Sequence, residues 1–533
     1  MIDSIDRIDL RLRQICDAVR LLAPCGLLIS LTVAIHSTAI APVQAEDGNW
    51  PQWRGPLMTG VSPSADPPVT WDEKTNIKWK VKIPGRGLST PLIWGNQVFI
   101  QTAIPVAKSD AEQAAKPDSS DAKADDKADK PDSAPVTAKG DAPRDGNADR
   151  PPPGDRADGP PPGGRADGPP PGGRGEGPPS GRGNGPPRGF GRGGMMSRPP
   201  KDPYQFVLLC LDRATGKSLW QKVAREEVPH EGTQFDNTFA SNSPVTDGKC
   251  VVAYFGSRGL HCYDMQGNLK WEKDLGRMKT KLSFGEGSSP ALFGNTVVVN
   301  WDHEGPGFIA AFDKETGNEL WRTPREEETS WTTPIVVERS GKAEVITAAT
   351  RKIRSYDLAD GKLLWECAGL TTNAIPTPVA GNGLVYATTG FRGYVMLAIR
   401  PEGNGDVTGT DAVAWTLKKG TPYVPSPLLY DDRLYFFSGN TAILSCINAK
   451  SGEPVYDGKR IEDLQGVYAS PVGASGRVYL VGRNGATVVI KHADTLEILA
   501  TNHLDERFDA SPALAGKELF LRGHDYLYCI AEK

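Results

Sequence analysis

A Ser-Pro or Thr-Pro pair followed by a short apolar run recurs eight times, and this repeat limits the possible folds more than any other feature. The pairs are Thr90-Pro91, Ser243-Pro244, Ser289-Pro290, Thr333-Pro334, Thr377-Pro378, Ser426-Pro427, Ser470-Pro471 and Ser511-Pro512. From the second pair onward, successive prolines are 46, 44, 44, 49, 44 and 41 residues apart (244, 290, 334, 378, 427, 471, 512). A period of this length is typical of a four-stranded β-propeller blade.

Each repeat begins with the sequence pattern of a β-hairpin. An apolar run leads to a turn rich in Gly, Asn or Asp, such as Asp247-Gly248 or Asp431-Asp432, and a second apolar run follows, such as Leu434-Tyr435-Phe436-Phe437. Two β-rich runs joined by such a turn predict a pair of antiparallel strands. Proline fits the start of the first strand, because its missing N–H breaks no ladder bond there.

A second recurring pattern joins the last two strands of a blade: Asp after an apolar residue, then Gly, then a strand that carries Trp. Its copies are Leu211-Asp212…Gly216…Trp220, Tyr263-Asp264…Gly267…Trp271, Phe312-Asp313…Gly317…Trp321 and Tyr356-Asp357…Gly361…Trp365, with a weaker copy at Ile447-Asn448…Gly452…Tyr456. Asp can accept N–H groups in the turn, Gly can adopt positive φ, and Trp can pack between blades. From Trp79 onward, apart from one insertion, the sequence therefore resembles the PQQ-like (quinoprotein-like) repeat family.

We expect an all-β fold: an eight-bladed β-propeller of four-stranded antiparallel blades. The last repeat stops at Ile530 without a fourth strand, and the sequence offers the missing strand at 77–81, before the first Thr-Pro pair. Pairing these two segments would close the ring with an N-terminal strand and leave no exposed sheet edge.

The remaining segments differ in composition from the repeats. Basic residues, an apolar run and the small-x-small sequence Val43-Gln44-Ala45 predict a signal peptide, either cleaved or kept as an anchor. The predicted layout is a signal peptide at 1–45, an entry segment at 46–75, the propeller at 76–103 and 204–533, and a Pro/Gly/Arg/Asp/Lys-rich insertion in blade one at 104–203. We expect this insertion to be disordered, and the protein to be periplasmic or secreted and not transmembrane after signal cleavage.

Charge gives no reason to expect a nucleic-acid partner. The net charge is −4, from 61 basic and 65 acidic residues. The Arg-Gly content of the insertion is compatible with RNA binding, but Phe190 is almost its only aromatic residue, and an exported protein seldom meets RNA. We therefore expect no nucleic acid among the partners.

Four of the eight cysteines share one position in the repeat, just before the apolar end of the third strand. They are Cys210, Cys262, Cys446 and Cys529, and the other repeats have Ala311, Ser355, Ala398 and Val489 there. Such a position predicts a small, buried packing site, and equivalent positions in different blades are too far apart for a disulfide. Cys250 and Cys367 fall outside this pattern, and a bond between them stays open.

The family resemblance implies that some relatives hold PQQ with a metal ion, often beside adjacent disulfide-linked cysteines. This sequence has no Cys-Cys pair and no Cys-x-x-Cys-His motif, so those residues cannot be carried over. The triplets His230-Glu231-Gly232 and His303-Glu304-Gly305 lack the paired-His spacing of a zinc site. We expect no catalytic residue, no metal site and no cofactor, with PQQ and Ca²⁺ as the alternative.

The repeat register also predicts one candidate binding site. Polar residues occur at comparable positions in the loops between the second and third strands of blades two to eight: Arg258, Asp302 and His303, Arg351, Arg392, Asn440, Arg483, and His524 and Asp525. Ring symmetry would bring these loops round one mouth of the channel. We hypothesise a positively charged funnel for an anionic ligand such as a carboxylate, sugar acid or acidic peptide, against the alternative of a solvated loop face.

Three classes of function compete. We predict a non-catalytic periplasmic scaffold that mediates protein–protein interactions in the cell envelope, as the resemblance to outer-membrane protein assembly factors implies. The opening Trp50-Pro51-Gln52-Trp53-Arg54-Gly55-Pro56 also resembles the entry segment of exported bacterial proteins of this repeat family. The alternatives are a PQQ-dependent oxidoreductase and a polysaccharide- or wall-binding module.

Overall fold

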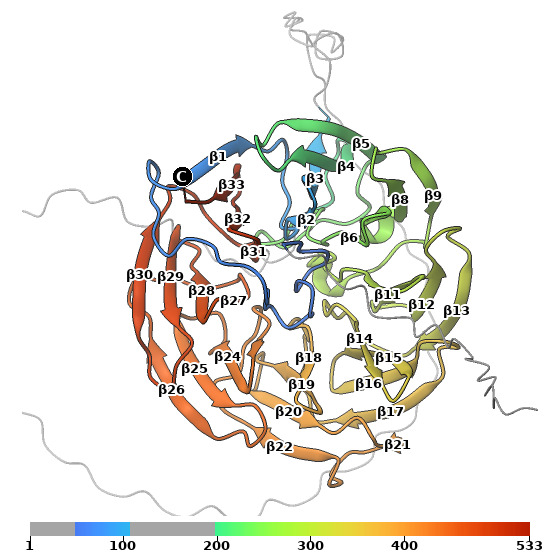
Figure 1. Cartoon of the computed structure of the whole chain (residues 1–533). Helices are drawn as coiled ribbons and strands as arrows, with labels where there is room; N and C mark the ends of the chain where they lie inside the picture. The colour runs from blue at the N-terminus through green and yellow to red at the C-terminus, as the bar shows by residue number, and fades with distance from the viewer. Residues whose placement is uncertain (1–47, 107–197, 533) are drawn as a thin grey trace, which may run out of the picture. The chain divides into compact units, whose positions relative to one another are not determined.

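Eight antiparallel sheets surround a central axis, one sheet for each Ser/Thr-Pro repeat (Figure 1). The structure is a computed structural model that describes residues 48–106 and 198–532. The predicted signal peptide and most of the predicted insertion lie outside the described residues. The eight-bladed, all-β prediction is confirmed.

Each blade runs from an inner strand at the axis to an outer strand at the rim. Blade one consists of β2 (Leu92–Trp94), β3 (Gln97–Pro105), β4 (Tyr204–Asp212) and β5 (Ser218–Glu227), and blade two of β6 (Val245–Thr246), β7 (Cys250–Tyr254), β8 (Leu260–Asp264) and β9 (Leu269–Lys273). Blade three consists of β10 (Ala291–Phe293), β11 (Thr296–Trp301), β12 (Gly307–Asp313) and β13 (Glu319–Arg325), and blade four of β14 (Ile335–Arg339), β15 (Lys342–Ala348), β16 (Lys352–Asp357) and β17 (Leu363–Ala368). Two short 3₁₀ turns, η1 (Gly256–Arg258) and η2 (Lys281–Ser283), lie in the loops around blade two.

The second half of the ring repeats this plan. Blade five consists of β18 (Val379–Gly381), β19 (Leu384–Thr389), β20 (Val395–Ile399) and β22 (Val413–Leu417), and blade six of β23 (Leu428–Tyr430), β24 (Arg433–Phe437), β25 (Ile443–Asn448) and β26 (Pro454–Arg460). Blade seven consists of β27 (Val472–Ala474), β28 (Arg477–Val481), β29 (Ala486–Lys491) and β30 (Ile498–His503), and blade eight of β31 (Ala513–Ala515), β32 (Glu518–Arg522), β33 (Tyr526–Ile530) and β1 (Ile77–Lys82). The outer strand of blade eight is thus the N-terminal strand β1, antiparallel to β33 with Lys80 opposite Tyr528. The predicted closure of the ring is confirmed.

Blade four departs from the four-stranded pattern. The chain between β20 and β22 forms β21 (Gly405–Asp406), which adds to the edge of β17 as a parallel fifth strand. Blade five has this excursion in place of the tight Asp…Gly turn of the other repeats. Strand β3 runs to Pro105, because its last residues stay paired with the start of β4.

The Ser/Thr residues of the repeat form a ring of hydrogen bonds around the channel. At seven junctions, the backbone N–H of one Ser/Thr donates to the hydroxyl oxygen of its counterpart in the next blade, at 2.9–3.3 Å, from Thr90 to Ser243 and onward to Ser511. At the eighth, the Thr90 hydroxyl donates to the Ser511 carbonyl at 3.2 Å. A buried N–H needs a partner, so each blade needs a hydroxyl at this position.

The Trp and Gly of the second pattern link neighbouring blades near the rim. The indole N–H of Trp271, for example, donates to the Lys314 carbonyl in the turn of the next blade at 2.8 Å, and Gly317 of that turn, with φ of 70°, lies against the Trp271 ring. A Cβ at Gly317 would come within 2.6 Å of the indole, so only glycine fits. Trp365 instead donates to Glu344, because the facing connection in blade five is the β21 excursion.

The entry segment crosses one end of the channel, as the blue trace at the centre of Figure 1 shows. Trp50 forms a bridge with Ile93 of blade one, and the Thr59 carbonyl accepts the Leu429 N–H of blade six. Between them Arg54 is fully buried and donates to the carbonyls of Pro427 and Pro471 at 2.9 and 3.0 Å. Burial without a carboxylate partner lowers the pKa of Arg54 to about 9. The segment therefore ties several blades together across the axis.

The cysteines of the repeat serve as packing residues. Cys210, Cys262 and Cys529 lie directly opposite Trp220, Trp271 and Trp79 on the neighbouring strand, where a small side chain leaves room for the indole. The six cysteines among the described residues are all buried free thiols. Cys250 in blade two and Cys367 in blade four are among them, so the bond that the sequence left open is not formed.

Candidate functional site

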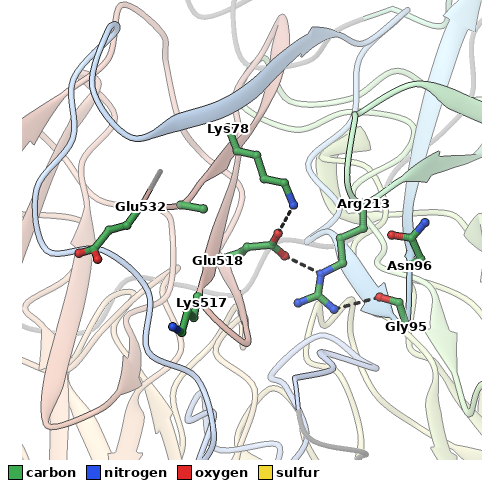
Figure 2. Close-up of a pocket in the computed structure, with 8 residues that line it drawn as sticks. Lys78, Gly95, Asn96, Arg213, Lys517, Glu518 and Glu532 are labelled. Atoms are coloured by element: carbon green, nitrogen blue, oxygen red, sulfur yellow. Dashed lines mark hydrogen bonds and ion pairs between the residues drawn. The ribbon is translucent and has the colours of Figure 1, made fainter.

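Two hollows stand out in the described part of the chain, and they differ in character. The first has a volume of about 640 Å³ and lies at the seam where blade eight meets blade one (Figure 2). There the Glu518 carboxylate accepts from Lys78 at 2.6 Å and from Arg213 at 2.5 Å, and Arg213 also donates to the Gly95 carbonyl at 2.9 Å. These charges bind one another across the junction. The seam hollow therefore serves the closure of the ring.

The second hollow is the central channel, with a volume of about 340 Å³. Its walls are the loops that lead from the outer strand of one blade to the inner strand of the next, here called the blade-linking loops. Its floor is formed by the Ser/Thr ring together with Trp53 of the entry segment, whose indole N–H donates to the Thr377 hydroxyl at 3.0 Å. The entry segment lies across the opposite end of the channel, and the cavity lies on the face that carries the blade-linking loops, here called the loop face.

The residues that face the channel cavity follow the repeat register. The residue two positions before each Ser/Thr of the repeat lies in its wall: Leu88, Ser241, Gly287, Trp331, Ile375, Val424, Tyr468 and Asp509. The side chain at this position varies from blade to blade, whereas the Ser/Thr-Pro pair does not. The repeat thus provides eight equivalent wall positions, and the variable residues there give the cavity its chemistry.

Aromatic rings dominate these walls. Trp331 packs against Phe284 with ring centroids 6.4 Å apart, and Tyr423 is stacked on Phe391 at 5.1 Å. Phe235 lies in the wall with 76% of its surface exposed to solvent, although it is a large apolar residue. Exposed apolar side chains gathered at a concave site are typical of binding surfaces.

An ionic cluster occupies one side of the cavity. Arg483 pairs with both Asp236 and Asp509, and Arg507 contacts the same two carboxylates at 2.5 and 3.1 Å. The Tyr468 hydroxyl donates to Asp236 at 3.1 Å, while burial, together with the Asp236 charge, raises the pKa of Tyr468 to about 12. The two carboxylates are therefore already matched by two guanidinium groups.

The seven predicted site residues all lie in the described part of the chain, on the loop face, and none of them lines the channel cavity. Arg258 is buried, with carboxylate oxygens of Glu227 and Glu286 each 3.3 Å away. His303 accepts the Lys279 N–H at Nδ1, 3.1 Å away, and Nε2 donates to the Pro306 carbonyl at 3.1 Å. These two side chains hold neighbouring loops in place.

The other predicted residues divide into bound and free side chains. Asn440 accepts the Val424 N–H at 3.0 Å, and His524 contacts Asp509 at 2.9 Å, so both support the cavity wall from behind, as Arg483 does. Arg351 and Arg392 are exposed at the rim. The structure therefore separates the predicted funnel into a bonded sector and two exposed arginines. Its role in binding a ligand stays a prediction.

The side chains of both His-Glu-Gly triplets form hydrogen bonds within the protein. The His230 ring donates to the Met278 carbonyl at 2.6 Å, and Glu231 accepts from the N–H and hydroxyl of Thr280 at 2.9 Å. Next to the second triplet, Asp302 forms a fully buried ion pair with Arg325 at 2.7 Å. Within the described ranges, no group of three or more His, Cys, Asp or Glu side chains could hold a metal ion.

Comparison with protein families decides the relationship that the repeats indicated. A family model described as outer membrane protein assembly factor BamB matches residues 205–456 and 305–533, which together span more than half of the 533 residues. The chain belongs to this BamB family. Both matches lie within the repeats after the insertion, and their overlap reflects the repetition of the blades.

Solved structures match this BamB-family chain at low sequence identity. BamB from Moraxella catarrhalis is 12% identical, with a TM-score of 0.45, over 63% of this chain and 95% of that one. A europium-containing methanol dehydrogenase is 8% identical, with a TM-score of 0.52, over 91% and 98% of the two chains. The computationally designed Ika8 protein is 13% identical, with a TM-score of 0.44, over 62% and 92%. No curated protein sequence matches the chain significantly.

The channel residues of this family member do not fit PQQ held by Ca²⁺. PQQ carries three carboxylates and Ca²⁺ takes six to eight oxygen ligands, so the pair needs cations and free carboxylates together. No Lys or Arg is among the described residues that line the cavity, and its two carboxylates, Asp236 and Asp509, are bound by Arg483 and Arg507. The two carboxylates that Ca²⁺ would need are thus already bound within the protein.

Among the residues that the structure describes, no helix is both long and apolar enough to cross a membrane.

Proposed function

We propose that this BamB-family chain is an exported, non-catalytic scaffold that binds another envelope protein on its loop face, with the channel cavity at the centre of the contact. One observation carries the proposal. The cavity combines a closed floor with aromatic walls and an exposed Phe235 at its open side. A concave apolar centre surrounded by polar groups is the usual anatomy of a protein-binding surface.

The polar groups of the cavity favour a binding role over a catalytic one. Asn237 donates to the carbonyls of Phe284 and Glu286, and its side-chain oxygen accepts from Thr238 and Ser241. A general base or nucleophile must keep an atom free for its substrate. A sugar ligand would also need free hydrogen-bonding groups here, which makes the wall-binding alternative the weaker one.

The test places a photo-crosslinking amino acid at Phe235 in the full chain, expressed in its own host. Leu269, 51% exposed on the outer strand of blade two, is the matched control position. We expect mass spectrometry to identify a defined envelope protein bound at Phe235 and absent from the Leu269 sample. Equal yields at the two positions would contradict the proposal.

A second arm of the experiment addresses the quinoprotein alternative. The purified full chain is mixed with PQQ and Ca²⁺, and dye-linked alcohol oxidation is followed. We expect the rate to equal that of a protein-free control. A saturable, protein-dependent rate would contradict a non-catalytic role.

A further inference from the structure

The size of the channel cavity limits what it can accept. About 340 Å³ is at the lower end of the roughly 300–1,000 Å³ range of ligand pockets. The cavity is closed below by Trp53 and surrounded by Phe284, Trp331 and Tyr423, so an entering group meets aromatic faces on several sides. These dimensions suit one bulky aromatic group inserted from the loop face.

The rim above blades four and five carries positive charge in excess. Arg351 is 78% exposed, and its nearest carboxylate, Glu328, lies at 3.6 Å and is already held by Lys281 at 2.7 Å. Arg392 lies over the Phe391 ring at 5.5 Å, and no described carboxylate forms an ion pair with it. In this sector Lys281 and Arg351 therefore share one carboxylate, and Arg392 has no carboxylate partner among the described residues.

The charged cluster at blades seven and eight is balanced by its own carboxylates. On the side of blades seven and eight, Arg483 and Arg507 are matched by Asp236 and Asp509. The sector around Arg351 and Arg392 thus differs in its charge balance from the side with Arg483 and Arg507. That sector adjoins the cavity, because Phe391, beneath Arg392, is stacked on the wall residue Tyr423.

We infer that the channel cavity receives a bulky aromatic side chain of a partner protein, and that Arg351 and Arg392 bind acidic residues next to that side chain in the partner's sequence. The two features are in contact through Phe391, which lies beneath Arg392 and is stacked on the wall residue Tyr423, so one extended segment can meet both. The aromatic side chain supplies apolar burial, and the acidic neighbours supply charge complementarity. This inference rests on the proposed function and specifies the chemistry of the partner.

The test uses the full chain and three blocked pentapeptides, and it measures Kd by fluorescence anisotropy. The first peptide has tryptophan between two pairs of aspartates, the second has alanine in place of tryptophan, and the third has asparagines in place of aspartates. We expect the first to bind about 30-fold more tightly than the alanine peptide and about 10-fold more tightly than the asparagine peptide. Binding of the first peptide should weaken as salt is added.

Variants of the protein show which of its residues bind the peptides. Phe235→Ala and Trp331→Ala should weaken the tryptophan peptide, and Phe235 is exposed enough that its loss leaves the fold intact. The double variant Arg351→Gln/Arg392→Gln should abolish the difference between the aspartate and asparagine peptides while keeping the preference for tryptophan. Lys362→Gln is the matched control, because Lys362 is 80% exposed on the opposite face.

Equal binding of the tryptophan and alanine peptides, or unchanged discrimination in the double arginine variant, would overturn the inference. So would binding of free indole-3-propionate as tight as that of the first peptide, because the cavity would then be a small-molecule site. The crosslinking experiment at Phe235 separates the two levels. A partner captured there with no pentapeptide bound refutes this inference and leaves the scaffold function standing, and the converse result refutes the scaffold function.

Discussion

The two faces of the propeller are built from the same repeats, yet the repeat controls them to different degrees. The turn face is the face that carries the turns between the third and fourth strands. There Asp212, Asp264 and Asp313 organise turns of similar form, and the entry segment crosses the channel. On the loop face, the blade-linking loops differ in length, from residues 228–244 between β5 and β6 to residues 326–334 between β13 and β14. The turn face therefore holds the ring together, and the loop face is free to vary with function.

Substitution of Trp50 should give the largest effect, because it removes the centre of the turn face. Trp50 is fully buried, forms a bridge with Ile93 and lies against Gly55. Trp50→Ala should lower the free energy of unfolding by about 3–5 kcal/mol in a denaturant titration. Trp331→Ala, in the half-buried cavity wall, should lower it by less. Equal losses would mean that the two faces contribute alike to stability.

Within the loop face, side chains that form ion pairs should contribute more to stability than exposed side chains. Arg483→Gln leaves Asp236 and Asp509 with one guanidinium partner fewer, and both carboxylates are almost fully buried. We expect it to cost about 1–3 kcal/mol of unfolding free energy. Arg392→Gln should change stability by no more than about 0.5 kcal/mol, because the side chain is exposed. Similar losses in the two variants would remove the distinction.

Loss of the ion pairs at the seam between blades eight and one should lower stability by a smaller amount. Glu518→Gln removes a carboxylate that binds Lys78 of β1 and Arg213 of blade one, and these groups are partly exposed. Stability should fall by about 1 kcal/mol, measured by thermal unfolding. The control Lys362→Gln removes an exposed ion pair with Asp360 and should be close to neutral. No loss at Glu518 would show that backbone pairing of β1 with β33 closes the ring unaided.

Substitution of a turn aspartate should have the smallest effect on stability, and this effect depends on pH. Hydrogen bonds from the backbone and side chain of Thr316 lower the pKa of Asp313 below its ordinary value. The ionised carboxylate therefore stabilises the fold at neutral pH, and this contribution is lost as pH falls below about 4 through the lowered pKa. Asp313→Asn should flatten the decline in stability between about pH 5 and pH 2.

Asn448, which occupies the same turn position in blade six, shows that asparagine preserves the turn. Its side-chain oxygen accepts the N–H groups of Lys450 and Ser451 at 2.9 and 3.0 Å. Stability at pH 7 should therefore change little in Asp313→Asn. An unchanged acid slope in this variant would mean that other carboxylates control acid unfolding.

The fold could be predicted because its determinants recur at a fixed period. The Ser/Thr-Pro pairs gave the number of blades, and the missing fourth strand after Ile530 indicated the closure by β1. The Asp…Gly…Trp pattern indicated how neighbouring blades pack. The fifth strand of blade four could not be predicted, because β21 comes from an irregular excursion in the next repeat.

The predicted site residues and the residues that line the channel cavity lie in different sets of loops. The predicted residues lie in the loops between second and third strands, whereas the cavity is lined by the blade-linking loops, which lead directly to the innermost strands. The position two residues before each Ser/Thr was available in the same register. Contacts such as that between Asp236 and Arg483 join residues 247 positions apart, and no local pattern predicts such a pair.

Hydrogen–deuterium exchange of the full chain, with and without the tryptophan–aspartate pentapeptide, tests the division between the two faces most directly. We expect added protection in the blade-linking loops at residues 228–242, 326–333 and 418–426, and none in residues 48–62 of the entry segment. Protection centred on the entry segment or on the seam around Glu518 would contradict the assignment of the loop face as the binding face.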